Sequence, residues 1–330
     1  MKNLKKIIID HFVTEGGKIQ KELPLFYETF GPTLGSAPIV LVNHALTGNS
    51  HVTGENGWWK ELIGDNKTID TNYYTVLAFN IPGNGFDGIP ENLIYNYTHY
   101  KTRDIAEIFW IALKELQVEN LFAVIGGSLG GGVAWEMAVL NPTGIENLIP
   151  IASDWKASDW VIGNTLVQDE ILNNSNYPIS DARAHAMLLY RSPQSFKKKF
   201  GRQKNEAKNI FEVESWLFHH GEKLQKRFQL SAYKLMNHLI KTIDITRDRG
   251  DFLSVVKEIQ SNIHIISVDT DNFFTAIENL ETYEELKTIK ENVFYHEIKS
   301  IHGHDAFLIE YEQLDGILNT LFIKTKEIVA

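Results

Sequence analysis

Ser128 is the residue whose surroundings most clearly indicate chemistry. It stands in the pattern Gly126-Gly-Ser-Leu-Gly130, after an apolar run that begins at Leu121 and before a helix-like segment that ends at Leu140. A serine at a sharp turn from strand to helix presents its hydroxyl as a nucleophile, and the glycines leave room for the strained backbone. The start of the following helix also favours negative charge. We therefore expect a covalent catalyst here rather than an ordinary glycine-rich turn.

A serine hydroxyl becomes a good nucleophile only beside a base that a third group orients. In proteins with such a turn, the partners follow in the order serine, acid, histidine. Two late apolar runs, 263–268 and 293–298, lead into loops with suitable residues. Asp269 and Asp271 both follow the first run, and His302 and His304 both follow the second. The residues alone leave both choices open.

Acyl chemistry at Ser128 also requires donors for the negative oxygen of a tetrahedral intermediate. One donor should be the N–H of Leu129, directly after the nucleophile, and the second should come from the loop after an early strand. That loop is 43–48, in which we expect the Leu46 N–H to be the donor and His44 to brace the loop.

Composition narrows the class of protein. The 330 residues are 43% hydrophobic, so the chain can bury a sizeable core, and the formal charge of −10 argues against nucleic-acid and anionic-membrane partners. The sequence contains no cysteine, and its histidines lack the spacing and carboxylate partners of a zinc site, so no metal is expected. No signal peptide or membrane span is apparent, and a cytoplasmic protein is the expectation.

The order of predicted elements indicates an α/β fold. Strands are expected at 5–12, 25–30, 37–43, 73–80, 121–127 and 147–153, with a helix at 102–116. The block 157–249 shows helical spacing at 181–190, 211–218 and 229–243 and no convincing strand, after which come a strand at 263–268, a helix at 278–290, a strand at 293–298 and a helix at 307–322. We predict a mostly parallel central sheet with helices on both faces, formed by 1–156 and 250–330, and a helical lid insertion at 157–249.

Several segments resemble the homoserine O-acyltransferases of the α/β-hydrolase superfamily. The likeness covers nearly the whole chain and rests on 43–49 (NHALTGN), 57–59 (GWW), 126–131 (GGSLGG), 190–192 (YRS), 200–202 (FGR), 269–274 (DTDNFF) and 303–308 (GHDAFL). It implies an α/β-hydrolase fold and a ping-pong acyltransferase of methionine biosynthesis. In such an enzyme Ser128 is acylated by acyl-CoA, with acetyl-CoA as co-substrate and no bound cofactor, and the acyl group passes to homoserine.

The resemblance also assigns roles that the residues alone leave open. It implies that Asp271 is the acid and His304 the base, that Asp305 contacts the substrate amine, and that the substrates are small molecules. It further implies a homodimer that forms through the lid helices.

The chain departs from the family pattern at the acceptor site. Gln168 stands where the family has an arginine that binds the homoserine carboxylate, and a neutral amide cannot replace a guanidinium in that pairing. Arg191 or Arg183 could supply the charge from the lid, and Tyr233 remains from a reduced substrate motif. These departures motivate an alternative, a serine esterase or thioesterase that uses the same triad with water as acceptor, while a non-catalytic binding protein is the third reading.

Overall fold

An eight-stranded sheet forms the centre of the computed structural model, which describes residues 4–329, with side chains up to Phe322. Residues 1–3 and 330 of the predicted core lie outside this range. The strand order is β1-β2-β6-β3-β7-β8-β11-β12. The six strands from β6 onward in this order run parallel to one another, β2 runs antiparallel to β6, and β1 runs antiparallel to β2. The prediction of a mostly parallel sheet is confirmed. The strands are β1 (Lys5–Val13), β2 (Ile19–Phe30), β3 (Ile39–Asn43), β6 (Thr75–Phe79), β7 (Leu121–Gly127), β8 (Ile145–Ile151), β11 (Asn262–Val268) and β12 (Val293–Ile298).

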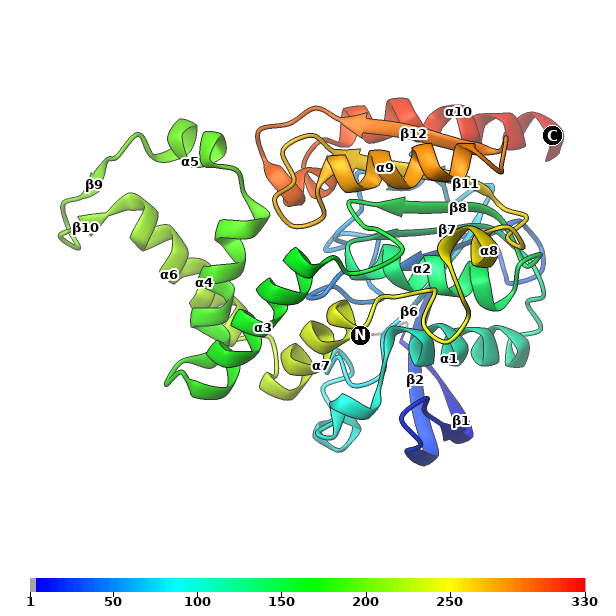
Figure 1. Ribbon diagram of the computed structural model, residues 1–330, viewed down its shortest axis with the longest axis horizontal. Helices are drawn as coiled ribbons and strands as arrows, with labels where there is room; N and C mark the ends of the chain where they lie inside the picture. The colour runs from blue at the N-terminus through cyan, green and yellow to red at the C-terminus, as the bar shows by residue number, and fades with distance from the viewer. Residues whose placement is uncertain (1–3, 330) are drawn as a thin grey trace.

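Helices cover both faces of the sheet, as predicted (Figure 1). Alternate strand residues point to opposite faces, so Leu41 joins one buried cluster while Val40 and Val42 join the other. The first cluster packs under α1 (Thr102–Glu115), α2 (Leu129–Leu140), α8 (Phe252–Val256) and α9 (Ala276–Lys287), and the second under α10 (Tyr311–Val329). Because helices bury both faces of the sheet, the central strands are continuous apolar runs in the sequence.

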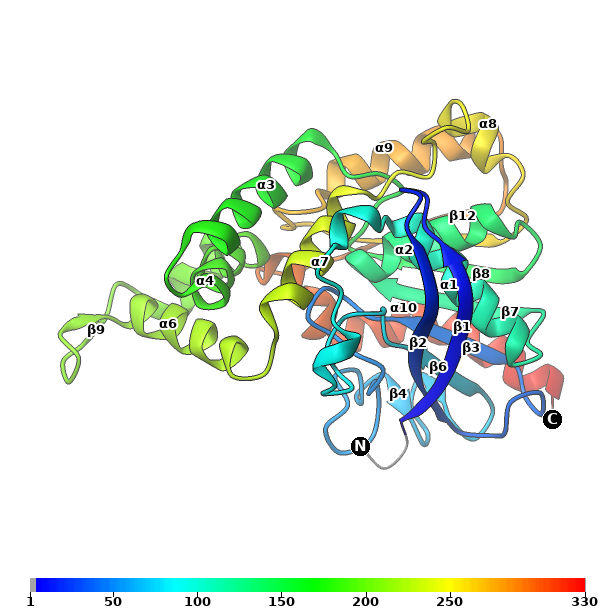
Figure 2. The same cartoon turned by 90° about the horizontal axis from the view of Figure 1, so that it is seen from below.

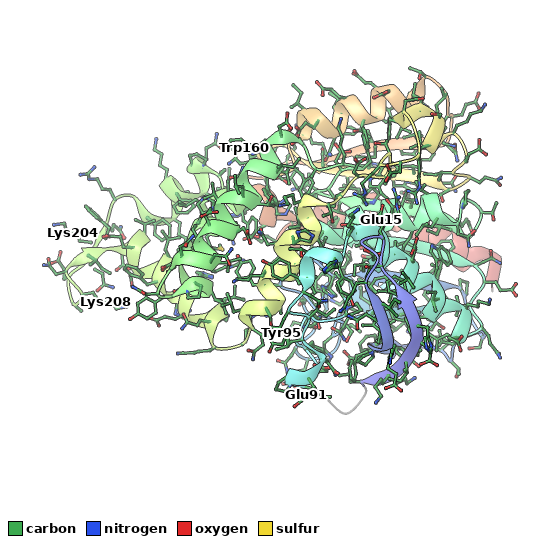
Figure 3. All side chains as sticks on the ribbon, turned by 60° about the horizontal axis from the view of Figure 1, so that its bottom comes forward. Glu15, Glu91, Tyr95, Trp160, Lys204 and Lys208 are labelled. Atoms are coloured by element: carbon green, nitrogen blue, oxygen red, sulfur yellow. The ribbon has the colours of Figure 1, made fainter. Side chains whose placement is uncertain are left out.

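A separate group of helices projects from the end of the core at which the parallel strands finish (Figure 1). These are α3 (Asp159–Asn174), α4 (Pro178–Tyr190), α5 (Pro193–Phe200), α6 (Glu212–Gln225) and α7 (Leu230–Lys241), and we call 157–249 the lid. Figure 2 shows α3, α4 and α6 extending beyond the core, with α7 against it. Lys204 and Lys208 mark the far tip of the lid in Figure 3.

The chain enters and leaves the lid through one narrow neck. The Ala157 N–H donates to the Ile243 carbonyl at 2.9 Å, and the Ile245 N–H donates to the Trp155 carbonyl at 3.2 Å. Lys156 and Asp244 form an antiparallel bridge between these bonds. The two connections are therefore held together by backbone pairing.

Two local predictions were wrong, and one helix was missed. The lid contains a small hairpin of β9 (Lys204–Asn205) and β10 (Ile210–Phe211), which is too short to show an alternating pattern. Helix α3 was not predicted, because exposed apolar residues such as Trp160 and Leu166 lie opposite buried ones and blur its periodicity. The closing helix begins at Tyr311, since Gly303–Leu308 forms the 3-10 helix η3.

The remaining elements are short. They are β4 (Ile63–Gly64), β5 (Ile69–Asp70), and the 3-10 helices η1 (Pro90–Asn92) and η2 (Tyr97–His99). Across residues 4–329, no helix is both long and apolar enough to cross a membrane.

Candidate active site

Ser128 lies at the turn between β7 and α2 in a strained conformation. Its φ and ψ are 55° and −124°, and its N–H donates to the Ile151 carbonyl of β8 at 2.9 Å. Few residues other than glycine adopt a positive φ, and such strain persists only where the surrounding structure imposes it. Every residue of β7 is buried, so the strand offers a rigid base from which the turn is held.

The glycines around Ser128 are required by close backbone contacts. A β-carbon on Gly126 would lie 2.4 Å from the Gly130 carbonyl, and one on Gly130 would lie 2.2 Å from the Asn43 carbonyl oxygen. The second contact places the loop after β3 directly against the serine turn. The pattern that identified Ser128 therefore has a steric cause in this fold.

Asp271 and His304 form a buried pair beyond the ends of β11 and β12. The His304 Nδ1 lies 2.7 Å from Asp271 Oδ2, and both side chains are almost completely buried. The other oxygen, Oδ1, accepts hydrogen bonds from the Phe273 and Phe274 N–H groups at 2.7 and 3.1 Å. With Nδ1 donating to the carboxylate, Nε2 is the nitrogen left to exchange a proton with a substrate.

The competing residues lie elsewhere. Asp269 is exposed and accepts a hydrogen bond from the Ser300 N–H at 2.9 Å. His302 Nδ1 lies 3.2 Å from Arg191 Nη1 and 3.3 Å from Ser195 Oγ, with no carboxylate of the described residues in ion-pair range. The geometry of an acid and base pair is met by Asp271 and His304.

Four aromatic rings surround the His304 imidazole. Their centroids lie 5.3 to 5.9 Å from that of the histidine and belong to Tyr190, Phe273, Phe274 and Phe307. Phe307 also brings the nucleophile turn close, because a β-carbon on Gly127 would lie 2.4 Å from its ring. The residue before Ser128 and the imidazole thus pack on the same side chain, in surroundings that exclude water and strengthen electrostatic interactions.

The loop after β3 has the features of an oxyanion hole. The N–H groups of Leu46 and Leu129 donate to no acceptor among residues 4–329. Leu129 is the first residue of α2, where an N–H has no partner within the helix. Two free amides on adjoining segments beside a serine are the donors that a developing oxyanion needs.

His44 braces this loop, as expected. Its Nδ1 lies 2.8 Å from the Ala45 carbonyl, and its Nε2 accepts the Ile81 N–H at 3.0 Å. Burial lowers the pKa of His44 to about 4, although the Ala45 bond opposes that shift. A neutral imidazole that donates at one nitrogen and accepts at the other holds the loop in place and is not free for proton transfer.

A buried polar chain supports the same loop, and sequence reasoning missed it. Asn80 Oδ1 accepts the Ser50 N–H at 3.0 Å, while Asn80 Nδ2 donates to Ser50 Oγ at 2.8 Å. Ser50 Oγ in turn donates to Glu28 Oε2 at 2.7 Å. The only sequence signal was a glutamate within an otherwise half-buried strand, which the strand pattern alone could not connect to residues 50 and 80.

The structure brings Gln168 and Tyr233 together in the lid. The Tyr233 hydroxyl donates to Gln168 Oε1 at 3.3 Å, and Gln168 Nε2 lies 3.0 Å from the Ala182 carbonyl and 2.7 Å from His185 Nδ1. Both polar ends of the Gln168 amide are therefore engaged within the lid. Gln168 and Tyr233 line a small cavity together with Leu46, Tyr190 and Phe273.

Arg191 and Asp305 form a second pair. Arg191 Nε donates to Asp305 Oδ2 at 2.9 Å, and Arg191 Nη1 reaches His302. This ion pair links the end of α4 to η3. The positive charge of the Arg191 guanidinium and the negative charge of the Asp305 carboxylate therefore neutralise each other.

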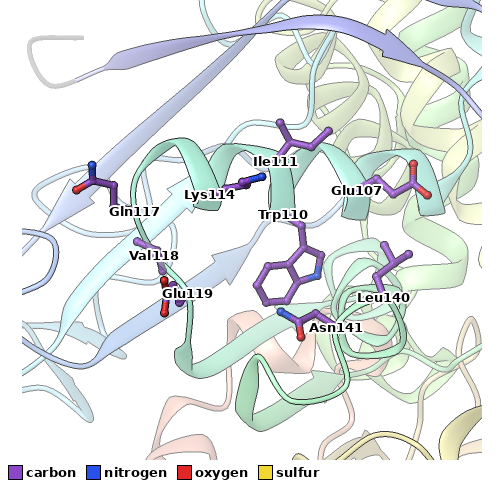
Figure 4. Close-up of a pocket in the computed structure, with 9 residues that line it drawn as sticks. All are labelled: Glu107, Trp110, Ile111, Lys114, Gln117, Val118, Glu119, Leu140 and Asn141. Carbon is purple, nitrogen blue, oxygen red and sulfur yellow. The ribbon is translucent and has the colours of Figure 1, made fainter.

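A broader surface pocket lies between α1 and the end of α2, away from the triad (Figure 4). Its nine lining residues include no serine, histidine or aspartate, so it offers no nucleophile with a base. Within residues 4–329, no three histidine or carboxylate side chains gather as metal ligands.

Comparisons with known proteins agree with this fold. A family model described as alpha/beta hydrolase fold matches residues 38–310. The homoserine O-acetyltransferase of Bacillus anthracis superposes with a TM-score of 0.87 at 18% identity, covering 97% of each chain, and the acetyl esterase MekB with 0.81 at 18%, covering 97% of this chain and 96% of that one. The protein is thus an enzyme of the α/β-hydrolase fold.

Sequence relatives narrow the class further. The chain is 34% identical to the homoserine O-acetyltransferase of Cyclobacterium marinum, over 94% of this chain and 92% of that protein. It is 32% identical to that of Chloroherpeton thalassium, over 92% of this chain and 85% of the relative. The chain belongs to the homoserine O-acetyltransferase family and is an acyltransferase.

Proposed function

We propose that this enzyme transfers an acetyl group from acetyl-CoA to the hydroxyl of homoserine or a related amino alcohol. The observation that carries the proposal is the buried Asp271–His304 pair, 2.7 Å apart, which packs through Phe307 against the turn that holds the strained Ser128, in a chain of this family. The thioester donor must acylate the serine, and the hydroxyl acceptor must remove the acyl group. One base serves both steps by taking and returning a proton.

In the first half-reaction, His304 Nε2 takes the Ser128 proton as Oγ attacks the thioester carbonyl. The Leu46 and Leu129 N–H groups hold the resulting oxyanion, and Asp271 stabilises the imidazolium. The carbon–sulfur bond then breaks, and His304 returns the proton to the departing thiolate. An acetyl ester on Ser128 and free CoA remain.

In the second half-reaction, His304 takes the proton of the acceptor hydroxyl, whose oxygen attacks the acetyl ester. The same two amides stabilise the second oxyanion. The ester bond to Ser128 breaks, and Oγ recovers the proton from His304. The products are the O-acetyl compound and the free enzyme, so donor and acceptor use one site in turn.

Intact-mass measurement tests the first step. Acetyl-CoA added without acceptor should leave one acetyl group on the wild-type chain and none on Ser128→Ala. Homoserine should then remove the acetyl group and yield O-acetylhomoserine. The proposal would be wrong if no adduct forms and if homoserine, serine and other amino alcohols cause no release of CoA.

A serine esterase or thioesterase is the second candidate. It is favoured by the neutral Gln168 at the carboxylate-binding position and by the acetyl esterase among the structural neighbours. Transferase and hydrolase share the acyl-enzyme and differ in whether water or an alcohol accepts the acyl group. Turnover of p-nitrophenyl acetate to acetate that homoserine does not divert would favour the hydrolase.

We also propose that the lid helices pair two copies of the chain. Helix α3 exposes Trp160, Leu166 and Val167 by 54, 55 and 45%, and Phe218 of α6 is 57% exposed. A run of exposed apolar side chains on one projecting group of helices is typical of an interface. Light scattering should show a dimer that Leu166→Asp disrupts and that Ile19→Asp, an exposed residue of β2, leaves intact.

A further inference from the structure

Glu28 of β2 is a buried carboxylate without an arginine or lysine partner among the described side chains. Its side chain is only 6% exposed. Oε2 accepts the Ser50 hydroxyl at 2.7 Å, and Oε1 lies 3.2 Å from Nδ1 of the half-exposed His51. Burying a carboxylate without a strong cationic partner is costly, which points to a role beyond packing.

The hydrogen bonds that start at Glu28 have a fixed direction. A carboxylate only accepts, so the Ser50 hydroxyl gives its hydrogen to Glu28 and accepts one from Asn80 Nδ2 at 2.8 Å. The Asn80 Oδ1 then accepts the Ser50 N–H and Asn84 Nδ2, both at 3.0 Å. The same Asn84 Nδ2 lies 3.4 Å from His44 Nε2. We call these five residues the Glu28 network.

The Glu28 network ends at the peptide group that carries the Leu46 N–H. His44 Nε2 accepts the Ile81 N–H at 3.0 Å, so the imidazole proton lies on Nδ1, which donates to the Ala45 carbonyl at 2.8 Å. The Gly48 N–H donates to the same carbonyl at 2.9 Å. In a trans peptide the C=O and the N–H point in opposite directions. Holding the Ala45 carbonyl therefore fixes the direction of the Leu46 N–H.

The segment 44–50 depends on such contacts because it belongs to no helix or strand. Ser50 at its far end is fastened by two hydrogen bonds to Asn80, and His44 at its near end lies within reach of Asn84. The network thus holds both ends of the segment that contains Leu46. An N–H group stabilises an oxyanion only when it points to the place where the charge develops, so this support bears on catalysis.

We propose that Glu28 is a positioning residue of the oxyanion hole, and that its carboxylate aims the Leu46 N–H through the Glu28 network. The inference rests on the proposed acyl chemistry at Ser128 and extends the machinery of that reaction to β2, a strand that carries no catalytic residue. The role requires a hydrogen-bond acceptor at position 28 and not a negative charge, and this requirement can be tested.

The kinetic test compares two replacements of Glu28. Glu28→Leu removes the acceptor, and the rates of Ser128 acetylation and of transfer to homoserine should both fall by about ten- to a hundredfold. The KM for acetyl-CoA should stay nearly constant, because an oxyanion contact exists only in the transition state. Glu28→Gln keeps an oxygen for the Ser50 hydroxyl and should recover most of both rates. Ser50→Ala breaks the same network with a smaller change and should match Glu28→Leu, even if the leucine variant does not fold.

A measurement without turnover uses methylboronic acid. The Ser128 Oγ adds to its boron while His304 takes the proton, and the resulting tetrahedral anion places a boron-bound oxygen in the oxyanion hole. The affinity should fall by about ten- to a hundredfold in Glu28→Leu and Ser50→Ala. His51→Asn is the matched control, because His51 contacts the other oxygen of the same carboxylate near the surface. It should change the affinity by less than about threefold.

Three results would overturn the role of Glu28. They are an unchanged boronate affinity in a well-folded Ser50→Ala variant, a loss of rate confined to one half-reaction, and equal losses in Glu28→Gln and Glu28→Leu. The proposed function is tested separately by acetylation of wild-type Ser128 with acetyl-CoA. That reaction can fail while the boronate affinities still report on Glu28, because an esterase would use the same oxyanion hole.

Discussion

Asp271 divides its two carboxylate oxygens between two tasks. Oδ1 accepts the backbone N–H groups of Phe273 and Phe274, which sets the loop, and Oδ2 faces His304. The loop geometry and the orientation of the base therefore depend on one buried side chain. The two tasks can be separated because only the second requires a negative charge.

Asp271→Asn should keep the loop and lose the catalysis. An asparagine can accept both backbone bonds through its oxygen, but its NH₂ group then faces His304 and favours the wrong imidazole tautomer. We expect kcat to fall by about 10⁴, the size of effect known for a triad aspartate, with little change in melting temperature. Stopped-flow acetylation and thermal unfolding would measure the two effects.

Asp269→Asn is the control, since Asp269 is exposed and its carboxylate accepts a hydrogen bond from the Ser300 N–H, away from His304. It should retain most of its activity. Equal losses in the two variants would show that the acid was misassigned.

Residue spacing could identify Ser128 because sterics make its glycines obligatory. It could not choose between residues two positions apart, such as Asp269 and Asp271. Their roles depend on how the chain turns after β11, and there the two carboxylates point to different partners. The family resemblance made that choice, and the structure pairs the two residues that it named. The Arg191–Asp305 ion pair could not be predicted from the sequence, because it joins a residue of the lid to a residue of the core.

At the scale of elements, the turn after β7 and η3 meet through Gly127 and Phe307. The absence of a side chain at Gly127 admits the Phe307 ring, which also packs on His304. Ser128 and His304 are far apart in the sequence, so this contact helps to set the distance between the proposed nucleophile and base.

Gly127→Ala should therefore disturb activity through packing. A β-carbon only 2.4 Å from the ring must displace η3 or the serine turn, at a typical cost of about 1–3 kcal/mol. A shift of the His304 imidazole by less than 1 Å relative to Ser128 should lower kcat/KM by at least about tenfold. Acetylation kinetics and chemical unfolding would check both figures.

Phe307→Leu in the Gly127→Ala background supplies the companion measurement. The smaller side chain should relieve the clash and restore part of the activity. No recovery, with each single variant well folded, would argue against a shared packing site.

Elements with strong periodicity were predictable from the sequence, and those with a blurred pattern or a conformation set by packing were not. The β-strands beside Ser128 are buried on both faces and read as apolar runs. Helix α3 was not predicted because its apolar side chains lie on both its exposed and its buried face, so the sequence shows no clear helical period. The 3-10 helix η3 escaped because its conformation depends on packing against β7 and the lid.

For the whole molecule, Asp154 couples stability to pH. It is buried beyond β8, where Oδ1 accepts the Trp155 N–H at 2.8 Å and the Thr282 hydroxyl at 2.9 Å. Burial raises its pKa from 3.8 to about 7. The folded protein therefore holds this proton up to a higher pH than the unfolded chain, and the associated stability is lost as pH rises from about 4 through 7.

Asp154→Asn should reduce this pH dependence, because the amide keeps an acceptor for Thr282 and never ionises. We expect the melting temperature of the variant to rise relative to wild type more at pH 8 than at pH 5, as followed by scanning calorimetry. Asp10→Asn, at an exposed carboxylate of β1, should leave the slope unchanged. Parallel wild-type and Asp154→Asn curves would contradict the role of Asp154.

The narrow neck divides the chain into a lid and a core that mutations can alter separately. Backbone pairing at 155–157 and 243–245 brings the departing and returning chain side by side, while Ser128, Asp271 and His304 all lie outside the segment between them. The segment between these points can therefore be replaced as one unit. Recombination at this one junction would exchange the lid helices and leave Ser128, Asp271 and His304 in place.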